Sequence, residues 1–554
     1  MKKLLTHTFR AGLLAACALA SGAYAQTPLP NPNQIATRTT PAPGSEAALR
    51  KLIDSVARGA PDYAAMTPIF AGAIRNDVRR SKELFAGFGA LQSLVFKEVS
   101  PQGADVYAAN FDTRTIEFRI MLDATGKMGV TFTPPPAAPI ERLDDTALAD
   151  FIRDEMDAMD YSGAVLVARD GKPIFAAARG LADREQNIPN TLDTRFRVGS
   201  MNKIMTAVGI MQLVQAKKVR LDATLGEYLE DYPNKELART VTVHQLLTHT
   251  GGTGDFFGPM YEPNRLSFRT LKDYVTVFGG RPTEFTPGDN YRYSNYGFIL
   301  LGRIIEEVSG QTYPDYIRDH VFKAAGMTRS GFEPEAIEVE GRAVGYIWES
   351  PAYRSAAKTL PPNGTSAGGG YATVGDFLAF ANALTGHKLL DAKHTDLMTT
   401  RKTSTGDGYG LEDLSTAEIR MVARGGGAGG MNGRMRIIGD GKVVIVALTN
   451  ENPPPFANAI ENKILSRIRV LTDSGRLATF RRASPAPDAT LEQRIAAFDA
   501  NDRNNDGKLD KAEVRGVLGT LGLYADQLNP ILALYDVNKD GFVSDEENRN
   551  PPPR

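Results

Sequence analysis

A serine and a lysine that stand three positions apart form the first candidate site of this sequence. The quartet Ser200–Lys203 opens a run whose apolar residues recur at helical spacing, namely Ile204, Met205, Val208, Met211 and Val214. This separation is nearly one helical turn, so the lysine amine would lie on the same face as the serine hydroxyl. A serine hydroxyl is a poor nucleophile, and a lysine activates it only where burial or nearby positive charge lowers the lysine pKa. We therefore expect Ser200 to be a nucleophile and Lys203 its base.

Two further patterns follow along the chain. Tyr293-Ser294-Asn295 lies in a loop just before an amphipathic helix, which suits side chains that project into a cleft. The glycine-rich segment Val422–Gly433 ends one strand and precedes the next, and its glycines let a backbone lie close against a ligand. Similar patterns at Ser355–Lys358 and Tyr232–Asn234 occur in proline-led segments, so we interpret both as structural.

In this order, the three patterns resemble those of the class C β-lactamase and penicillin-binding-protein-like serine hydrolases. This family also includes esterases and D-amino-acid peptidases. The resemblance covers nearly all of the region from 144 to 473 and includes the segments FRVGSMNKIMTAV, TVHQLLTHTGG, YSNYGFILLG and GTSAGGGYATVGDFLAF.

The resemblance implies a role for each candidate residue. Ser200 would be the acylated nucleophile, and Lys203 would help to deprotonate it. Tyr293 would pass the proton to the leaving group, and Asn295 would position the substrate or Lys203. The backbone N–H groups of Ser200 and Gly427 would form the oxyanion hole, and this chemistry needs no cofactor.

The third family motif departs from its usual form. The family carries K-T-G or H-x-G, whereas this chain has Arg424-Gly425-Gly426. Arginine keeps a positive charge that could hold a substrate carboxylate and keep Lys203 neutral, but it cannot act as a base. We therefore favour ester or amide cleavage over β-lactam hydrolysis. Two decoys, His249-Thr250-Gly251 and Lys402-Thr403-Ser404, are interpreted as structural, and His244 and His249 as hydrogen-bonding residues at helix ends.

Two segments near the end of the chain have the spacing of calcium-binding EF-hand loops, DRNNDGKLDKAE and DVNKDGFVSDEE. Calcium prefers many oxygen ligands, which each loop offers at its first, third, fifth, seventh, ninth and twelfth positions. The candidate ligands are Asp502, Asn504, Asp506, the carbonyl of Lys508, Asp510 and Glu513, then Asp536, Asn538, Asp540, the carbonyl of Phe542, Ser544 and Glu547. We expect one paired module that binds two calcium ions.

An α+β architecture must position these residues. We expect a β-lactamase-like antiparallel sheet with a helical subdomain at 144–473, closed by a hairpin at its start and by strands at 417–423 and 434–449. A small α+β domain at 46–133, resembling a cystatin-like or NTF2-like sheet on a helix, would precede it, with helices from Glu46 and over Ile69–Phe88 before four strands. A linker at 474–490 would lead to an all-α EF-hand pair at 491–550.

The first residues indicate export. A basic start, a short apolar core and Ala-Tyr-Ala before Gln26 predict a signal peptide at 1–25, followed by a flexible lead-in at 26–45. This favours a periplasmic or secreted protein, with lipid anchoring through Cys17, the only cysteine, as the alternative. No later apolar run is long enough to cross a bilayer.

The composition narrows the range of partners. The chain has 64 Lys and Arg against 65 Asp and Glu in 554 residues, which does not favour nucleic acid as a partner. We expect a small ester, amide or peptide-like substrate, together with calcium. Two alternatives stay open: a β-lactamase or D,D- or D-amino-acid peptidase, and a non-catalytic, calcium-dependent binding protein on the same fold.

Overall fold

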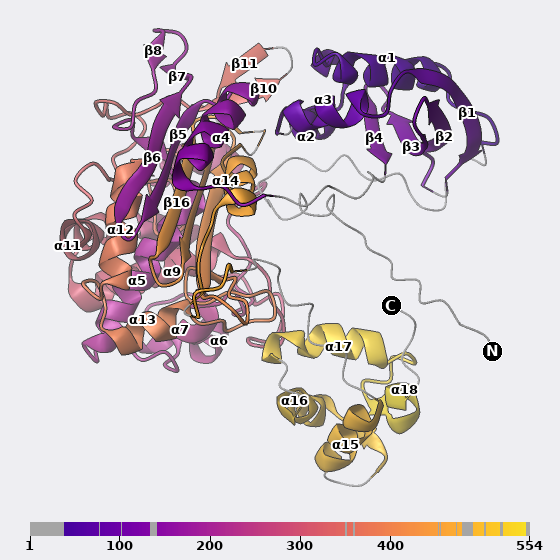
Figure 1. Cartoon of the computed structure of the whole chain (residues 1–554). Helices are drawn as coiled ribbons and strands as arrows, with labels where there is room; N and C mark the ends of the chain where they lie inside the picture. Colours follow the sequence, from indigo (N-terminus) through magenta and orange to yellow (C-terminus); the bar gives the residue numbers. More distant parts are fainter. Residues whose placement is uncertain are drawn as a thin grey trace.

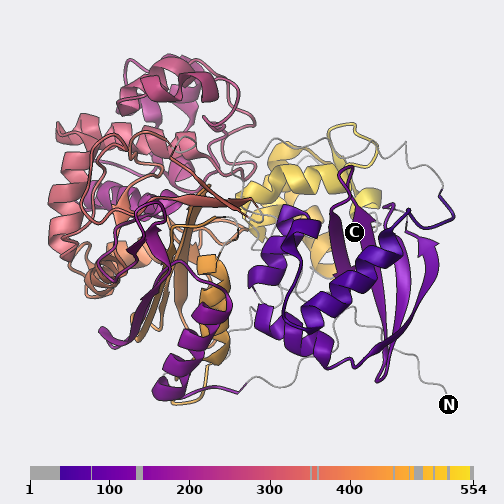
Figure 2. The ribbon, with the colours of Figure 1, turned by 90° about the horizontal axis from the view of Figure 1, so that it is seen from above.

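The computed structural model describes residues 38–76, 78–100, 102–132, 141–349, 352–357, 361–452, 454, 456–472, 474–478, 491–502, 506–520 and 524–549. Three units follow one another along the chain (Figure 1). Seen from above, the first and last units lie on the same side of the large central one (Figure 2). The predicted signal peptide and Cys17 lie outside the described residues.

The first unit packs helices against a four-stranded antiparallel sheet in the order β1-β2-β3-β4. Its elements are α1 (Ser45–Ala57), α2 (Pro68–Asn76), α3 (Val78–Ala86), β1 (Leu91–Val99), β2 (Asp105–Phe111), β3 (Thr115–Leu122) and β4 (Met128–Phe132). Buried and exposed residues alternate along β3, as expected for a sheet covered on one face. The helix predicted over Ile69–Phe88 corresponds to α2 and α3, which lie on either side of residue 77, a position outside the described residues.

The central unit contains a six-stranded antiparallel sheet in the order β13-β14-β15-β16-β5-β6. The strands are β5 (Gly163–Arg169), β6 (Lys172–Arg179), β13 (Glu412–Asp413), β14 (Met421–Ala428), β15 (Met431–Ile438) and β16 (Val443–Thr449). Because β5 pairs with β16, the beginning and end of this unit meet in one sheet, which confirms the predicted fold class. Helices α4 (Asp145–Ala158) and α14 (Phe456–Arg467) cover one face through a separate apolar core.

Two predicted strand boundaries are wrong. The segment expected as one strand over 434–449 forms two, because Gly439, Asp440 and Gly441 turn the chain with φ angles of 59°, 53° and 98°. The strand expected at 417–423 runs instead from Met421 to Ala428 as β14, so Arg424–Gly427 lies inside it and pairs with β15. The glycine-rich segment thus ends one strand and precedes the next, as predicted.

The helical subdomain covers the other face of the sheet and is built around α5 (Asn202–Gln215) and α9 (Asn295–Ser309). The other helices here are α6 (Lys235–Thr240), α7 (Val243–Leu247), α8 (Leu271–Phe278), α10 (Tyr313–Ile317), α11 (Lys323–Ala325), α12 (Val374–Thr385) and α13 (Ala392–Thr399). Short strand pairs complete the unit: β7 (Leu181–Asp183) with β8 (Ile188–Pro189), β9 (Phe196–Arg197) with β12 (Tyr371–Ala372), and β10 (Tyr346–Glu349) with β11 (Ala352–Ser355). Most of α5 is buried, so its polar residues are drawn into the core.

The last unit is a small helical module, drawn in yellow in Figure 1. It consists of α15 (Leu491–Asn501), β17 (Lys508–Leu509), α16 (Lys511–Thr520), α17 (Leu528–Tyr535), β18 (Val543–Ser544) and α18 (Asp545–Arg549). The antiparallel pair β17–β18 joins the two predicted calcium loops, and Leu509 and Val543 enter a core of their own with Phe498 and Leu528. The two loops therefore form one paired unit.

The predicted lead-in before the first unit and the predicted linker after the central unit each contact a folded unit. Before α1, Arg38 forms an ion pair of 2.7 Å with the buried Asp105 of β2. After the central unit, the N–H of Ala478 donates to the carbonyl of Val470 at 2.8 Å, and Ala478 packs into the core beneath α14. Residues 479–490 of the predicted linker lie outside the described residues. Within the described part of the chain, no helix is both long and apolar enough to cross a membrane.

Candidate active site

Ser200 and Lys203 lie at the start of α5, in a buried turn. A short 3-10 turn at Gly199–Met201 leads directly into α5, so both side chains point from the same end of the helix. The Lys203 side chain is 0% exposed, and its Nζ lies 3.1 Å from Ser200 Oγ. The structure therefore brings the predicted nucleophile and base into hydrogen-bond contact.

The surroundings of Lys203 favour a neutral amine. Its Nζ donates to Asn295 Oδ1 at 2.7 Å and to the carbonyl of Ala367 at 2.5 Å. Burial, with the positive charge of Arg424 as a second cause, lowers the pKa of Lys203 well below its usual value. A neutral amine that uses two hydrogens in this way directs its lone pair towards Ser200.

Tyr293 approaches Ser200 from the other side. Its hydroxyl donates to Ser200 Oγ at 2.8 Å and accepts a hydrogen bond from Arg424 Nη2 at 3.1 Å. Tyr293 immediately precedes Ser294, the N-cap residue of α9, whose hydroxyl accepts from the N–H of Gly297 at 2.8 Å. Burial raises the pKa of the Tyr293 hydroxyl, and the charge of Arg424 opposes that rise.

Asn295, the first residue of α9, is held by a residue that sequence reasoning missed. Its Nδ2 donates to Asp255 Oδ2 at 2.8 Å. Because the amide nitrogen donates to this carboxylate oxygen, the contact fixes the amide so that Oδ1 faces Lys203. Asp255 follows a glycine-rich turn in the sequence, and a lone acid in such a turn was the only available signal.

His249 lies beneath the tyrosine, although its motif was set aside as a decoy. The His249 ring packs 4.4 Å from the Tyr293 ring, and its Nδ1 accepts a hydrogen bond from the N–H of Ser294 at 3.1 Å. Burial lowers the pKa of His249 well below its usual value, so the ring is neutral. The histidine is a hydrogen-bonding residue, as expected, but it also supports Tyr293.

Strand β14 runs close beside Ser200. A Cβ on Gly426 would lie 2.2 Å from the carbonyl oxygen of Val198 and 2.9 Å from the nitrogen of Ser200. A Cβ on Gly199 would lie 3.0 Å from the nitrogen of Gly427. Only glycines permit this approach, which brings the backbone amides of Ser200 and Gly427 into the same neighbourhood.

Arg424 completes the cluster from within β14. It is 4% exposed, and its Nε donates to the carbonyl of Ser200 at 3.3 Å while Nη2 donates to Tyr293. The guanidinium therefore ties the strand to both the nucleophile and the phenol. The other Y-x-N copy lies elsewhere, since the Tyr232 hydroxyl shares a hydrogen bond of 3.1 Å with that of Tyr296. Lys358 of the other S-x-x-K copy lies outside the described residues.

The two calcium loops fold with the same internal hydrogen bonds. Asp502 accepts from the N–H groups of Asp506 at 3.2 Å and Gly507 at 2.9 Å. Asp536 repeats this with Asp540 at 3.1 Å and Gly541 at 3.0 Å. The two glycines at the sixth positions have φ angles of 75° and 89°, which the sharp bend of such a loop requires.

The twelfth residues of both loops also match. Glu513 accepts from the N–H of Asp510 at 3.0 Å, and Glu547 accepts from the N–H of Ser544 at 2.9 Å. Asn504 lies outside the described residues, and within the described ones no three His, Cys, Asp or Glu side chains converge as a metal cluster. The carboxylate, amide and hydroxyl oxygens still form the kind of donor set that fits calcium.

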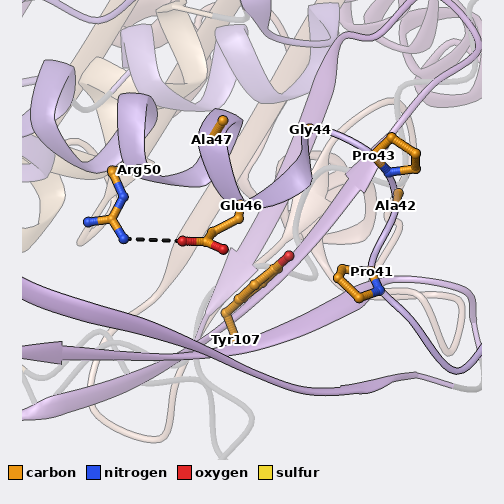
Figure 3. Close-up of a pocket in the computed structure, with 8 residues that line it drawn as sticks. All are labelled: Pro41, Ala42, Pro43, Gly44, Glu46, Ala47, Arg50 and Tyr107. Carbon is orange, nitrogen blue, oxygen red and sulfur yellow. Dashed lines mark hydrogen bonds and ion pairs between the residues drawn. The ribbon is translucent and has the colours of Figure 1, made fainter.

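A separate pocket lies on the first unit (Figure 3). It is lined by α1, the segment before it and Tyr107 of β2, and its Glu46–Arg50 pair is a surface contact of 3.2 Å. None of the candidate catalytic residues lines it, so this pocket is separate from the cluster around Ser200.

Comparison with known proteins agrees with this geometry. The Beta-lactamase family matches residues 148–467, more than half of the chain, and the EF hand family matches residues 495–518. Penicillin-binding protein 4 of Amycolatopsis lactamdurans is 28% identical over 310 residues, which cover 52% of this chain and 80% of that protein. Esterase EstB of Burkholderia gladioli is 32% identical over 194 residues, which cover 32% of this chain and 49% of that protein.

A solved structure shares the fold of the central unit. The penicillin-binding protein from Bacillus halodurans is 30% identical and superimposes with a TM-score of 0.51, covering 58% of this chain and 99% of that one. This chain thus spans between 49% and 80% of the length of the two relatives named above, and the matched region is the central unit that holds Ser200.

Proposed function

The chain belongs to the Beta-lactamase family and is a serine hydrolase, and from this premise we propose that it is exported and cleaves esters or amides through an acyl-Ser200 intermediate. One observation carries the proposal. Ser200 Oγ lies between two groups able to move its proton, 3.1 Å from Lys203 Nζ and 2.8 Å from Tyr293 Oη. This is the geometry that a nucleophile and its base require.

Acylation proceeds by balanced proton transfers. Ser200 Oγ attacks the substrate carbonyl as its proton passes to the neutral amine of Lys203. When the tetrahedral intermediate collapses, the Tyr293 hydroxyl protonates the leaving group, and Arg424 stabilises the resulting phenolate. A proton then returns from Lys203 to Tyr293, and hydrolysis of the acyl-enzyme runs the same steps with water as the nucleophile.

The developing oxyanion is stabilised by backbone donors. The N–H groups of Ser200 and Gly427 belong to two elements that the glycines of β14 hold together. Donors fixed before the reaction need no reorganisation when the charge forms, and for this reason such holes contribute strongly to catalysis. Asn295 positions Lys203, since its Oδ1 accepts from Nζ.

From the presence of Arg424 in the third motif we infer that small esters and amides are the substrates. The third motif of the family usually places a lysine or histidine at this position, whereas here a guanidinium fills the space beside Tyr293. The β-lactamase and D-amino-acid peptidase alternatives remain candidates because relatives of this chain are named penicillin-binding proteins. The non-catalytic alternative has no support in the site, where the nucleophile and its proton acceptor are in contact.

The C-terminal module binds calcium through two loops in this proposal. The ligands are Asp502, Asn504, Asp506, Asp510 and Glu513 of the first loop with the carbonyl of Lys508, and the corresponding oxygens of the second loop. Calcium would draw together carboxylates that now accept backbone hydrogen bonds. The predicted division of the chain at 46–133, 144–473 and 491–550 is part of this proposal, with the hydrolase unit extended to Ala478.

Activity-based labelling tests the hydrolase proposal. A fluorophosphonate ester should label the purified full chain, and the Ser200→Ala variant should remain unlabelled. A panel of p-nitrophenyl esters, D-amino-acid amides and nitrocefin should show turnover of esters or amides first. Equal labelling of both proteins, or none of the wild type, would refute the acyl-Ser200 mechanism.

A further inference from the structure

The calcium module contacts the hydrolase unit beside its active site. Asp289 of the hydrolase unit is 1% exposed, yet it forms ion pairs with two residues of α16, Lys511 at 2.7 Å and Arg515 at a shorter distance. The N–H of Asn529, in α17, donates to the carbonyl of Asp289 at 3.1 Å. Figure 1 shows α16 and α17 in yellow beneath the central unit.

Asp289 belongs to the segment that carries the catalytic tyrosine. Only residues 290–292 separate it from Tyr293. The segment is tied back to the turn around His249, because the N–H of Arg292 donates to the carbonyl of His249 at 3.0 Å. A buried carboxylate is costly without a cation, so the position of Asp289 depends on Lys511 and Arg515.

A second contact reaches the active site by a different route. Asp526 of the module is 4% exposed and accepts from Ser404 Oγ at 2.7 Å and from the Ser404 N–H at 3.2 Å. Ser404 lies between Thr403 and Thr405, and the Thr405 hydroxyl donates to Asp407 at 2.6 Å. Asp407 in turn interacts with Tyr291 and Arg424.

The docking residues and the calcium ligands share one element. Helix α16 begins inside the first calcium loop, and the candidate ligand Glu513 stands between Lys511 and Arg515. Any movement of Glu513 towards a bound ion therefore moves both cations that hold Asp289. The end of the first loop and the docking residues Lys511 and Arg515 therefore belong to one helix.

We propose that calcium binding at the first loop favours the docking of the module on Asp289 and Ser404, and thereby orders the segment that presents Tyr293 to Ser200. Calcium then acts as an activator of the hydrolase site by stabilising its proton donor. This inference rests on the proposed function for its effect on catalysis, but the coupling between calcium and docking stands independently of it.

Coupling of this kind is reciprocal. If calcium favours docking, docking must raise calcium affinity by the same factor. Asp289 lies in the hydrolase unit, outside both loops, so its effect on calcium affinity reports docking. Two substitutions that remove charges of opposite sign distinguish an effect of docking from a direct electrostatic effect on the bound ion. Loss of a negative charge at Asp289 would weaken cation binding electrostatically, but loss of the positive charge of Arg515 would strengthen it, whereas loss of docking weakens it in both cases.

The test measures calcium affinity of the full chain by calorimetric titration with calcium chloride. Asp289→Asn and Arg515→Gln should each raise the calcium dissociation constant of the first site about fivefold or more. Matched controls are Asp396→Asn, which removes an exposed pair with Arg420, and Arg549→Gln, which removes a pair within α18. Neither control should raise the calcium dissociation constant of the first site.

Hydrogen exchange of the same proteins locates the effect. In the wild type and the controls, calcium should slow amide exchange in residues 286–294 and 403–407, and this slowing should disappear in Asp289→Asn and Arg515→Gln. Calcium should also accelerate fluorophosphonate labelling of Ser200 in the wild type. Tighter calcium binding by Arg515→Gln, or exchange in both segments that does not respond to calcium, would overturn the proposal. An unlabelled Ser200 with these exchange effects intact would refute the hydrolase mechanism and leave the coupling supported.

Discussion

At the level of single residues, the chemistry depends on a lysine that is neutral in the folded protein. Burial and the charge of Arg424 lower the pKa of Lys203, while Asp255 acts in the opposite direction. A lysine acts as a base only when it is neutral, so acylation should increase as the pH rises through this pKa and be lost as the pH falls. In the proposed mechanism, Arg424 thus acts through its charge and does not accept a proton.

The Arg424→Gln variant tests this electrostatic role. Removal of the guanidinium charge should raise the pKa of Lys203 and move the rise in labelling rate to higher pH. A change of one pKa unit corresponds to about tenfold slower labelling at pH values below the transition. The measurement is the rate of fluorophosphonate labelling as a function of pH.

Arg420→Gln is the matched control, because Arg420 lies just before β14 and pairs with Asp396 at the surface. Its pH profile should coincide with that of the wild type. A profile of Arg424→Gln that keeps the wild-type midpoint and only loses amplitude would show that the arginine acts through position rather than charge.

At the level of elements, the active site depends on how closely β14 approaches the start of α5. The sheet and the helix come from distant parts of the chain, and Gly426 is the point where they meet. Serine, lysine and tyrosine side chains align only if the strand keeps this distance. In the Arg424-Gly425-Gly426 triplet, substitution of Gly426 should therefore reduce activity more than substitution of Gly425.

Gly426→Ala should reduce the labelling rate of Ser200 about 100-fold, since its Cβ would lie 2.2 Å from the Val198 oxygen and displace the oxyanion donors. Gly425→Ala is the control, because the nearest atom to its Cβ would be the end of the Arg434 side chain at 3.0 Å rather than a backbone atom. Both variants should retain the wild-type circular dichroism spectrum. Equal rates for the two variants would contradict the close-approach argument.

At the level of the whole molecule, the first unit is attached through a hairpin of the central one. Trp348 of β10 is 7% exposed and completes the core of the first unit, and the Arg75 guanidinium lies 4.6 Å from its ring centroid. The same arginine donates to Tyr353 of β11 at 2.9 Å. The first unit is therefore fixed to the hydrolase rather than loosely tethered.

Trp348→Ala should lower the free energy of unfolding of the first unit by about 3 kcal/mol, since a large buried ring leaves a cavity. Hydrogen exchange of β2 and β3 measures this local stability. Ile69→Ala, at a residue of α2 that is 84% exposed, should change it by less than about 0.5 kcal/mol. Equal exchange rates in the two variants would show that the hairpin contributes nothing to this core.

Loss of calcium binding at both loops should leave the hydrolase unit folded. Asp502→Ala combined with Asp536→Ala should abolish calcium binding in a calorimetric titration, because each loop loses its first ligand. The module has its own core around Phe498 and Leu528, so the central unit should keep its main unfolding transition by differential scanning calorimetry. Collapse of that transition would show that the module is a structural part of the hydrolase.

Local patterns in the sequence were sufficient to predict the class of the protein. The spacing of Ser200 and Lys203, the alternation along the strands and the ligand order of the calcium loops are short-range features, because each is set by neighbouring residues within one element. The resemblance to the family is carried by motifs of this kind, and the family and the EF hand are confirmed by the matches at 148–467 and 495–518.

The remaining features depend on contacts between residues that are distant in the sequence. No local pattern shows that His249 packs under Tyr293 or that Asp255 orients Asn295. The docking of Asp289 on α16 likewise joins two units with separate cores. Such contacts arise from the packing of whole elements, since burial and charge at each position depend on which surfaces come together in three dimensions.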